Sequence, residues 1–404
     1  MTHEPLSSLP PFTAGWRRRQ WLQVAGAGLL MAGHGLQAAF AATPQARGKL
    51  VVVMLRGALD GLAAVPAIGD PQWAALRPPL TETNASPAPP LPLDGLFGLH
   101  PALPRLHGWY TEGQLLLVHA VASPYRERSH FDAQQLLESG GQRPFELTTG
   151  WLGRALAAGG QRGVALSPAM PVALRGAPGA STWTPARGAS PDADLMARIA
   201  QTYQNDPVLA GLLEQALGQR EMLGAGTREP GMGSGTGSAA AFAGLARQAG
   251  RFLAEPGGPD VAWLDFDGWD THTQQAGRLQ RQLGALDTGL ATLRESLGER
   301  WADTTVLVMT EFGRSATLNG SGGTDHGTGG VAMLAGGAVA GGRVLTDWPG
   351  LGQPALLDGR DLRPTRDVRS LLTPLLQRHL GVGQADMARV LPGAPAGATG
   401  LWRT

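Results

Sequence analysis

The sequence contains no cysteine among its 404 residues. That absence excludes a disulfide scaffold, an iron–sulfur cluster held by thiolates, and a zinc site built from cysteine. Charged residues are also scarce and make up 16% of the chain, against roughly 25% in an average soluble domain. The formal net charge is only +1, so the charge balance gives no reason to expect nucleic-acid binding.

Glycine and proline are abundant instead. The chain has 59 glycines and 31 prolines, but they follow no Gly-X-Y period, which excludes a collagen-like triple helix. Hydrophobic residues account for 43% of the chain. This content is high enough to build a core, and it argues against global disorder.

The N-terminal segment has the pattern of an export signal. The pair Arg18 and Arg19 precedes an apolar stretch at 24–32, and Ala39-Phe40-Ala41 then has the small-x-small pattern of a cleavage site. We predict a twin-arginine (Tat) signal peptide over 1–41 and export through the Tat machinery to the periplasm or the medium. An ordinary secretory signal and an uncleaved membrane anchor are the alternatives, although a comfortable span needs about 20 apolar residues.

Apolar runs alternate with helical patterns along the rest of the chain. Short apolar runs indicate buried strands at 50–55, 114–122, 261–266, 305–310 and 331–334. Helical patterns cover 130–139, 149–158, 193–204, 207–223, 239–255, 275–299 and 368–380. This alternation predicts an α/β fold with a mostly parallel central sheet and helices on both faces. We expect a single domain over 42–404, with Gly/Pro-rich insertions near 163–190 and 224–238.

Polar side chains gather where the predicted strands end. The first strand is followed by Asp60, and the second by Ser123, Arg126, Arg128, Ser129, His130 and Asp132. The end of the third carries Asp265, Asp267, Asp270 and His272, and the fourth is followed by Glu311, Arg314, Asp325 and His326. Because ligands of parallel α/β sheets bind beyond the carboxyl ends of the strands, we expect a site there. Its oxygen and imidazole groups suit divalent Zn, Mn, Mg or Ca.

Several of these segments resemble a known superfamily. Asp325-His326-Gly327, after a Gly-rich loop, resembles the Asp-His-Gly motif of the alkaline phosphatase and sulfatase superfamily, in which this Asp and His bind a metal. A closer resemblance, over roughly 48–393, is to an uncharacterised Tat-exported bacterial family within it, domain-of-unknown-function family 1501. The segments that carry it are Leu55-Arg56-Gly57-Ala58-Leu59-Asp60-Gly61, Arg128-Ser129-His130-Phe131-Asp132-Ala133-Gln134, Gly268-Trp269-Asp270-Thr271-His272, Glu311-Phe312-Gly313-Arg314 and Gly323-Thr324-Asp325-His326-Gly327. The resemblance implies an alkaline phosphatase-like fold.

The resemblance also implies two metal positions. Asp60, Asp325 and His326 would hold one ion, and Asp270 and His272 would help to hold a second. The superfamily usually leaves three residues between the ligands of its Asp/His element, whereas one residue separates Asp270 from His272. Asp60 followed by glycine also fits a plain turn after a strand.

The remaining implied roles concern the reaction. Ser129 would be the nucleophile, activated by a metal on its oxygen, although Ser129 also fits the N-cap of the helix that follows it. Arg126 or Arg128 would bind the oxygens of a small anionic ester. Glu311 would support an auxiliary ion or orient the metal ligands.

Three functions follow from these residues. The first is an exported metal-dependent hydrolase of phosphate or sulfate esters with a serine nucleophile. The second is a non-catalytic periplasmic protein that binds a metal or ligand, or serves assembly, on the same fold. The third is a metal-free Ser-His-Asp hydrolase, against which stands the lack of a G-x-S-x-G elbow.

Overall fold

The computed structural model describes residues 48–78, 88–185, 193–222 and 239–403, and Gly48–Thr404 form one compact unit. The signal peptide predicted over 1–41 and the connection predicted at 224–238 lie outside the described residues. Within the described ranges, no helix combines the length and the apolar character needed to cross a bilayer.

The secondary structure follows the predicted alternation closely. The strands are β1 (Leu50–Arg56), β2 (Leu91–Pro92), β3 (Gly98–Leu99), β4 (Leu115–Ala122), β5 (Gly163–Leu166), β6 (Ala180–Thr182), β7 (Val261–Asp267), β8 (Thr305–Thr310), β9 (Gly330–Ala335), β10 (Arg343–Leu345) and β11 (Arg366–Asp367). The α-helices are α2 (Gly61–Ala64), α3 (Trp73–Leu76), α4 (Pro104–Thr111), α5 (His130–Ser139), α6 (Trp151–Gly159), α7 (Ala193–Tyr203), α8 (Pro207–Met222), α9 (Ala239–Ala254), α10 (Gln275–Leu297), α11 (Arg369–Leu375) and α12 (Gln384–Val390). Short 3₁₀ or π segments are η1 (Val172–Leu174), η2 (Gly298–Asp303), η3 (Gln353–Ala355) and η4 (Leu376–Leu380).

One large sheet organises the described unit. It has nine strands in the order β10-β4-β9-β8-β1-β7-β5-β6, with β11 also paired to β4. All pairings in it are parallel except those of β9, which runs antiparallel to both β4 and β8. The predicted mostly parallel sheet is confirmed.

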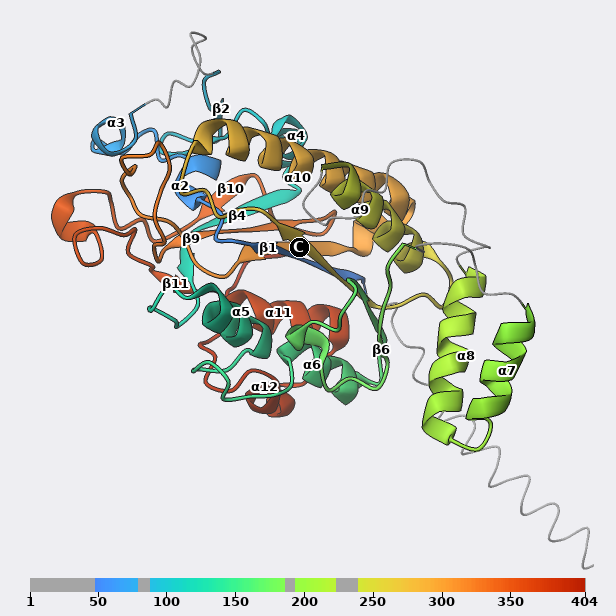
Figure 1. The fold of residues 1–404 in the computed structure, drawn as a ribbon. Coiled ribbons are helices and arrows are strands. Elements are labelled where there is room, and N and C mark those ends of the chain that lie inside the picture. The colour runs from blue at the N-terminus through green and yellow to red at the C-terminus, as the bar shows by residue number, and fades with distance from the viewer. Residues whose placement is uncertain (1–47, 79–87, 186–192, 223–238, 404) are drawn as a thin grey trace, which may run out of the picture. The chain divides into compact units, whose positions relative to one another are not determined.

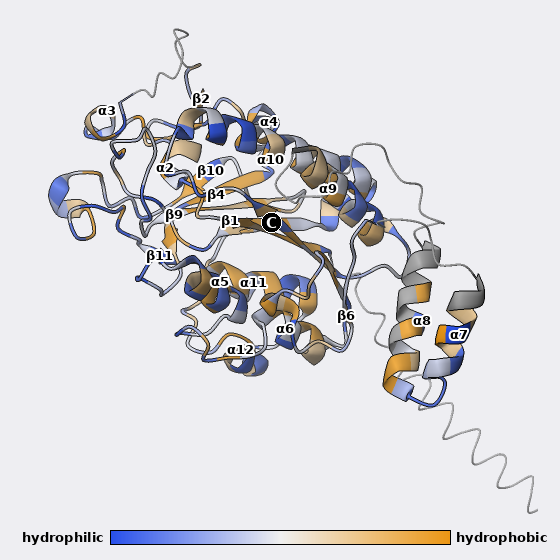
Figure 2. Ribbon diagram, viewed as in Figure 1, coloured by the Kyte–Doolittle hydropathy of each residue, from blue (hydrophilic) through white to orange (hydrophobic). Residues whose placement is uncertain are grey.

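Strand β1 shows why the sequence has continuous apolar runs. Successive side chains of a strand point to opposite faces, and Val53 and Leu55 enter one buried apolar cluster while Val52 and Met54 enter a second one. A parallel strand covered on both faces must therefore be apolar at every position. Figure 2 shows the apolar colouring of the central strands.

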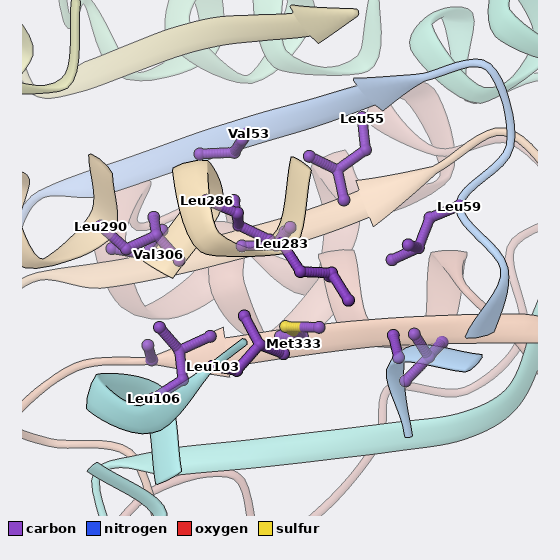
Figure 3. Close-up of a cluster of buried hydrophobic side chains, with 14 of the residues drawn as sticks. Val53, Leu55, Leu59, Leu103, Leu106, Leu283, Leu286, Leu290, Val306 and Met333 are labelled. Carbon is purple, nitrogen blue, oxygen red and sulfur yellow. The ribbon is translucent and has the colours of Figure 1, made fainter. Parts of the chain in front are cut away.

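Helices cover both faces of the sheet, as predicted. Figure 1 shows α4, α9 and α10 on one side and α5, α6, α11 and α12 on the other. The leucines of α10 recur at helical spacing, which predicts a stripe facing the core. The structure buries all of them: Leu279, Leu283, Leu286, Leu290 and Leu293. Three of these leucines are seen in Figure 3 beside side chains of β1 and β8.

Two segments differ from the sequence-based expectation. The region 163–190 is not wholly irregular, because β5 and β6 within it extend the sheet in parallel beyond β7. Strands of three or four residues are too short to show a period, so their Gly- and Pro-rich surroundings dominate the pattern. The helix expected over 368–380 is present as α11 and η4, with Pro374 inside α11, and α12 follows it.

A buried histidine in β4 makes a testable link between fold and pH. His119 is fully buried, its Nε2–H donates to the carbonyl oxygen of Val65 (3.0 Å), and its Nδ1 accepts from the amide of Ala120 (2.8 Å). This pair of bonds needs the neutral ring, because a protonated ring cannot accept. Burial lowers the pKa of His119 from 6.5 to about 4.

We therefore expect His119 to reduce the free energy of unfolding as the pH falls from 6.5 to about 4. In this window the unfolded chain binds a proton that the folded chain excludes, so the stabilisation is complete only above the window. The loss should approach about 3 kcal/mol. Urea unfolding at two pH values should show a smaller pH dependence for His119→Gln than for the wild type. Equal pH dependence in the two proteins would contradict this assignment.

Candidate metal centre

Three parallel strands end together and place their following loops at one edge. Arg56 at the end of β1 pairs with Asp267 at the end of β7, and Leu55 pairs with Thr310 at the end of β8. The loops after these strands are packed tightly: Gly57 has φ +112°, and a Cβ there would lie 2.6 Å from the amide nitrogen of Asp270. The ends of β1, β7 and β8 thus lie side by side at one edge of the sheet.

The direction of β9 completes the edge. Because β9 runs antiparallel to β4 and β8, its first residue, Gly330, lies beside Val121 near the carboxyl end of β4. Residues that precede β9 therefore reach the same edge as residues that follow the other strands. This geometry brings His326 to Arg314, with which it forms an isolated antiparallel bridge.

Three histidines and one aspartate converge at this edge. The Nε2 atoms of His130 and His326 are 3.0 Å apart, as are those of His272 and His326. Asp270 Oδ1 lies 3.3 Å from His326 Nε2 and 3.0 Å from His272 Nε2. Among the described residues, His130, Asp270 and His326 form a group whose ligand atoms all lie within 4.8 Å of one another. A single ion of the size of Zn²⁺ can contact all three of these side chains.

The other ring nitrogen of each histidine faces an acceptor. His326 Nδ1 lies 3.0 Å from the carbonyl oxygen of Arg128, and His130 Nδ1 lies 2.7 Å from a carboxylate oxygen of Glu311. Since a carbonyl or carboxylate oxygen only accepts, both Nδ1 atoms carry the hydrogen. In a neutral ring this leaves the Nε2 lone pair directed at the centre of the group.

Two facing lone pairs at 3.0 Å repel each other, whereas a proton or a metal ion between His130 and His326 would bind both. The hydrogen bond to Glu311 raises the pKa of His130, whereas burial, and then the charge on His130, lower the pKa of His326. In histidines that bind a metal, one ring nitrogen usually points at the metal while the other donates its hydrogen to an oxygen acceptor. These side chains therefore fit a divalent metal ion.

Asp270 is held in place by a buried arginine. Arg314 is almost fully buried and donates to Asp270 Oδ1 at 2.6 Å, and it also bonds the backbone oxygen of Thr324. Partial burial alone would raise the pKa of Asp270, but the hydrogen bond from Arg314 and its charge outweigh that and keep the pKa low. Asp270 is thus an anion fixed in orientation at neutral pH.

Asp325 supports His272 on the open side of the group. His272 Nδ1 lies 3.3 Å from Asp325 Oδ1, which also accepts from Asn319. About half of the Asp325 side chain is exposed, and the His272 side chain is 42% exposed. Asp325, predicted to bind a metal directly, here contacts a histidine instead, while its neighbour His326 enters the group.

Glu311 lies behind His130, where it orients this histidine. Its side chain is fully buried and accepts from His130, from Gln134 (2.9 Å) and from the amide of Gly57 (2.8 Å). Burial alone would raise the pKa of Glu311, but the hydrogen bonds from His130, Gln134 and the backbone outweigh it and keep the pKa low. Of the two roles predicted for Glu311, the contacts match the orienting one.

Asp60 is placed differently from the predicted ligand role. In the described part of the chain its carboxylate is bound by both terminal nitrogens of Arg77, at 2.7 and 3.1 Å, and by Gln275 at 2.8 Å. It also caps the short helix α2 through the amide of Ala63. Burial would raise the pKa of Asp60, but Arg77 outweighs it and lowers the pKa. Asp60 is thus part of a buried ion pair with Arg77.

The residues predicted to act on the substrate lie beside His130. Ser129 is the N-cap residue of α5, but its side chain makes no capping hydrogen bond. Arg128 has φ +62°, a strained value for a non-glycine residue, and this conformation presents its carbonyl to His326. Its guanidinium bonds the buried Asp361. Arg126 is exposed, and its guanidinium bonds the carbonyls of Ser123 and Tyr125.

Sequence reasoning gave no role to His130, Arg77 or Arg314. His130 is one of the side chains that follow a predicted strand, but the resemblance to the superfamily implies a role for its neighbour Ser129 and none for His130. The signal that could have found it is the need of an imidazole-rich site for several histidines at one edge. Arg77 follows no strand and no motif, so no sequence signal connects it to Asp60.

Comparison with protein families gives a clear match. Residues 116–392 match the family described as Protein of unknown function (DUF1501). The chain belongs to the DUF1501 family. The matched region of this DUF1501 protein includes His130, Asp270, His272 and His326. It leaves out strand β1, and it also leaves out Asp60 and Arg77, which follow that strand. Among curated proteins, none matches the chain.

The DUF1501 chain is also similar to solved structures at low identity. Against Ps i-CgsB in complex with k-i-k-neocarrahexaose the identity is 10% and the TM-score 0.41, covering 87% of this chain and 75% of that one. Against a 2-O GAG sulfatase, BT1596, the identity is 11% and the TM-score 0.38, covering 74% of this chain and 66% of that one. Against the phosphonate monoester hydrolase of Agrobacterium radiobacter the identity is 13% and the TM-score 0.33, covering 88% of this chain and 79% of that one.

Proposed function

We propose that this DUF1501 protein is a metal-dependent hydrolase of phosphate or sulfate esters. The observation that carries the proposal is the convergence of His130, Asp270 and His326. Glu311 holds the Nδ1 of His130, Arg314 holds the carboxylate of Asp270, and a backbone carbonyl holds the Nδ1 of His326. Imidazole-rich donor sets suit Zn²⁺ better than Mg²⁺ or Ca²⁺. Of the divalent ions that the sequence left open, Zn²⁺ therefore fits best.

Ser129 is the proposed nucleophile. It precedes His130 directly, it is half-buried, and the helix cap does not use its hydroxyl. A bound divalent ion supplies Lewis acidity, which favours the reactive, deprotonated form of a nearby hydroxyl. Ser129 would take the phosphoryl or sulfuryl group, the alcohol would leave, and water would release the group from the serine. Arg126 and Arg128 would orient the oxygens of this small anionic ester.

The proposal includes export. The sequence pattern over 1–41 supports passage through the Tat machinery to the periplasm or beyond. The Tat route carries folded proteins, which suits a chain that loads its metal inside the cell. An uncleaved signal that anchors the protein is the alternative.

One observation favours a second function, metal or ligand binding without turnover. Asp60 is engaged by Arg77, and the described residues offer one group of converging ligands, where the resemblance implied two. A phosphoryl or sulfuryl transfer helped by two ions would lack one of its clamps.

A hydrolysis assay distinguishes the two proposed functions. We expect the exported protein to hydrolyse aryl phosphate or sulfate esters, to lose this activity with a chelator, and to regain it with Zn²⁺. Ser129→Ala should lower kcat by at least about 100-fold, as loss of a nucleophile does, with unchanged zinc content.

The matched control is Ser123→Ala, in the same segment before α5. The Ser123 hydroxyl accepts from the amide of Tyr125 at 3.3 Å and takes no part in the proposed reaction. This variant should keep both its activity and its zinc. Zinc bound at full occupancy without hydrolysis of any ester by the wild type would instead support the binding function.

A further inference from the structure

A continuous chain of hydrogen bonds runs behind His130 to the end of β1. His130 donates to Glu311 at 2.7 Å, and Gln134 donates to the same Glu311 oxygen at 2.9 Å. The amide oxygen of Gln134 accepts from Arg56 at 2.8 Å. Arg56 in turn pairs with Glu138 and Asp265, each at 2.8 Å. Two buried or nearly buried carboxylates thus fix the far end of a chain whose near end is a metal ligand.

Helix α5 supplies most of this chain from one face. His130, Gln134 and Glu138 are spaced by four residues, which places them in one row along the helix. The row faces the ends of β1 and β8, from which Arg56 and Glu311 reach it. A polar row with this spacing on the buried side of a helix is unusual unless its members are paired, and each member here is paired.

We propose that Gln134, fixed by Arg56, is a positioning residue that makes His130 a metal ligand through Glu311. This inference rests on the metal centre of the proposed function, but not on its hydrolytic activity. It assigns a role to two residues, Arg56 and Gln134, that take no direct part in the histidine group.

The direction of each hydrogen bond in the chain follows from Arg56. A guanidinium only donates, so the oxygen of the Gln134 amide faces Arg56 and its NH₂ faces Glu311. Gln134 and the Gly57 amide both donate to Glu311 Oε1, which therefore faces His130 as an acceptor. His130 must then place its hydrogen on Nδ1, and the lone pair on Nε2 is directed at Asp270 and His326. The guanidinium of Arg56, which can only donate, therefore fixes the direction of the three hydrogen bonds that end at the His130 ring.

The test compares three variants in the full-length protein. Gln134→Leu removes both hydrogen bonds, whereas Gln134→Glu keeps the shape and can still accept from Arg56, and it can donate to Glu311 only in its protonated form. Gln135→Leu is the matched control, because Gln135 is the next residue of α5 and bonds the backbone of Phe145 and Leu147 instead. Urea unfolding verifies that each variant is folded.

We expect the Kd for Zn²⁺ to rise by about 10-fold in Gln134→Leu, the lower end of the range for loss of a direct partner of a metal-binding histidine, because Gln134 acts on His130 through Glu311. Gln135→Leu should bind Zn²⁺ like the wild type. The visible spectrum of the Co²⁺-loaded protein should change in the Gln134 variants and not in the control, because it reports ligand geometry. A folded Gln134→Leu variant with wild-type Kd and wild-type Co²⁺ spectrum would overturn the inference.

A second measurement does not depend on metal. In the metal-free, histidine-labelled protein, ¹⁵N NMR should show a hydrogen on Nδ1 of His130, and the Gln134→Leu variant should carry less hydrogen there. His130 with its hydrogen on Nε2 alone in the wild type would overturn the inference. Zinc affinity that depends on Gln134 in a protein without hydrolytic activity would uphold it while the proposed function fails.

Discussion

His326→Ala is expected to abolish metal binding. His326 Nε2 lies 3.0 Å from the Nε2 atoms of both His130 and His272 and 3.3 Å from Asp270. Its removal therefore leaves only two members of the group of three converging ligands, His130 and Asp270. Mass spectrometry of the exported protein should find about one ion per wild-type chain and none in the variant. Because partners of ligands alone cost about 10- to 100-fold in affinity, loss of this ligand should cost at least 100-fold.

The matched control for this experiment is His107→Ala. His107 lies on α4, and its Nε2 bonds the carbonyl of Pro92, away from the group. This variant should keep its ion. Full metal content in His326→Ala would refute the site, and two ions per wild-type chain would show that a second set of ligands exists beyond the one described here.

Asp60→Ala is expected to lower the free energy of unfolding by about 3–5 kcal/mol and to leave the metal content unchanged. The side chains of Asp60 and Arg77 are 1% and 5% exposed, and they form a two-bonded ion pair. Breaking a buried pair by removing one partner leaves the other charge buried and unpaired, which is the source of this large cost. Urea unfolding gives the stability, and mass spectrometry gives the metal content.

Three comparisons make this experiment decisive. Arg77→Ala should cost a similar amount, and the double variant should cost less than the sum, because neither charge is then left alone. Asp386→Ala removes a partner of Arg389 in an exposed pair, and it should cost less than about 1 kcal/mol. If Asp60→Ala loses its ion but stays stable, Asp60 is a metal ligand, as the resemblance to the superfamily implied.

These two experiments address the part of the site that local sequence could not determine. Asp60 lies at the end of a strand, next to a glycine, in a segment that matches the family pattern, so its position near the site was predictable. Its partner Arg77 comes from an irregular stretch with no periodic signal. Which carboxylate at a crowded edge meets a guanidinium, and which meets a histidine, depends on the path of such loops.

The histidines illustrate the same limit. His272 and His326 were expected as ligands because each stands in a motif near a strand end. His130 stands in such a motif too, but the helix that begins there could present either Ser129 or His130 to the centre. The answer depends on Glu311, which follows β8 and lies 181 positions away in the chain, and whose buried carboxylate orients the ring.

The sequence by itself determined the α/β architecture, the strands β1, β7 and β8, and the edge where polar side chains collect. These features depend on local hydrophobic period and on the rule that parallel strands end at a common edge. Only the tertiary structure decided that β9 runs antiparallel, that Asp60 pairs with Arg77, and that His130 joins His326. Each of these depends on hydrogen-bond partners far away in the chain, and a buried polar group takes whichever partner the packed backbone brings within about 3 Å.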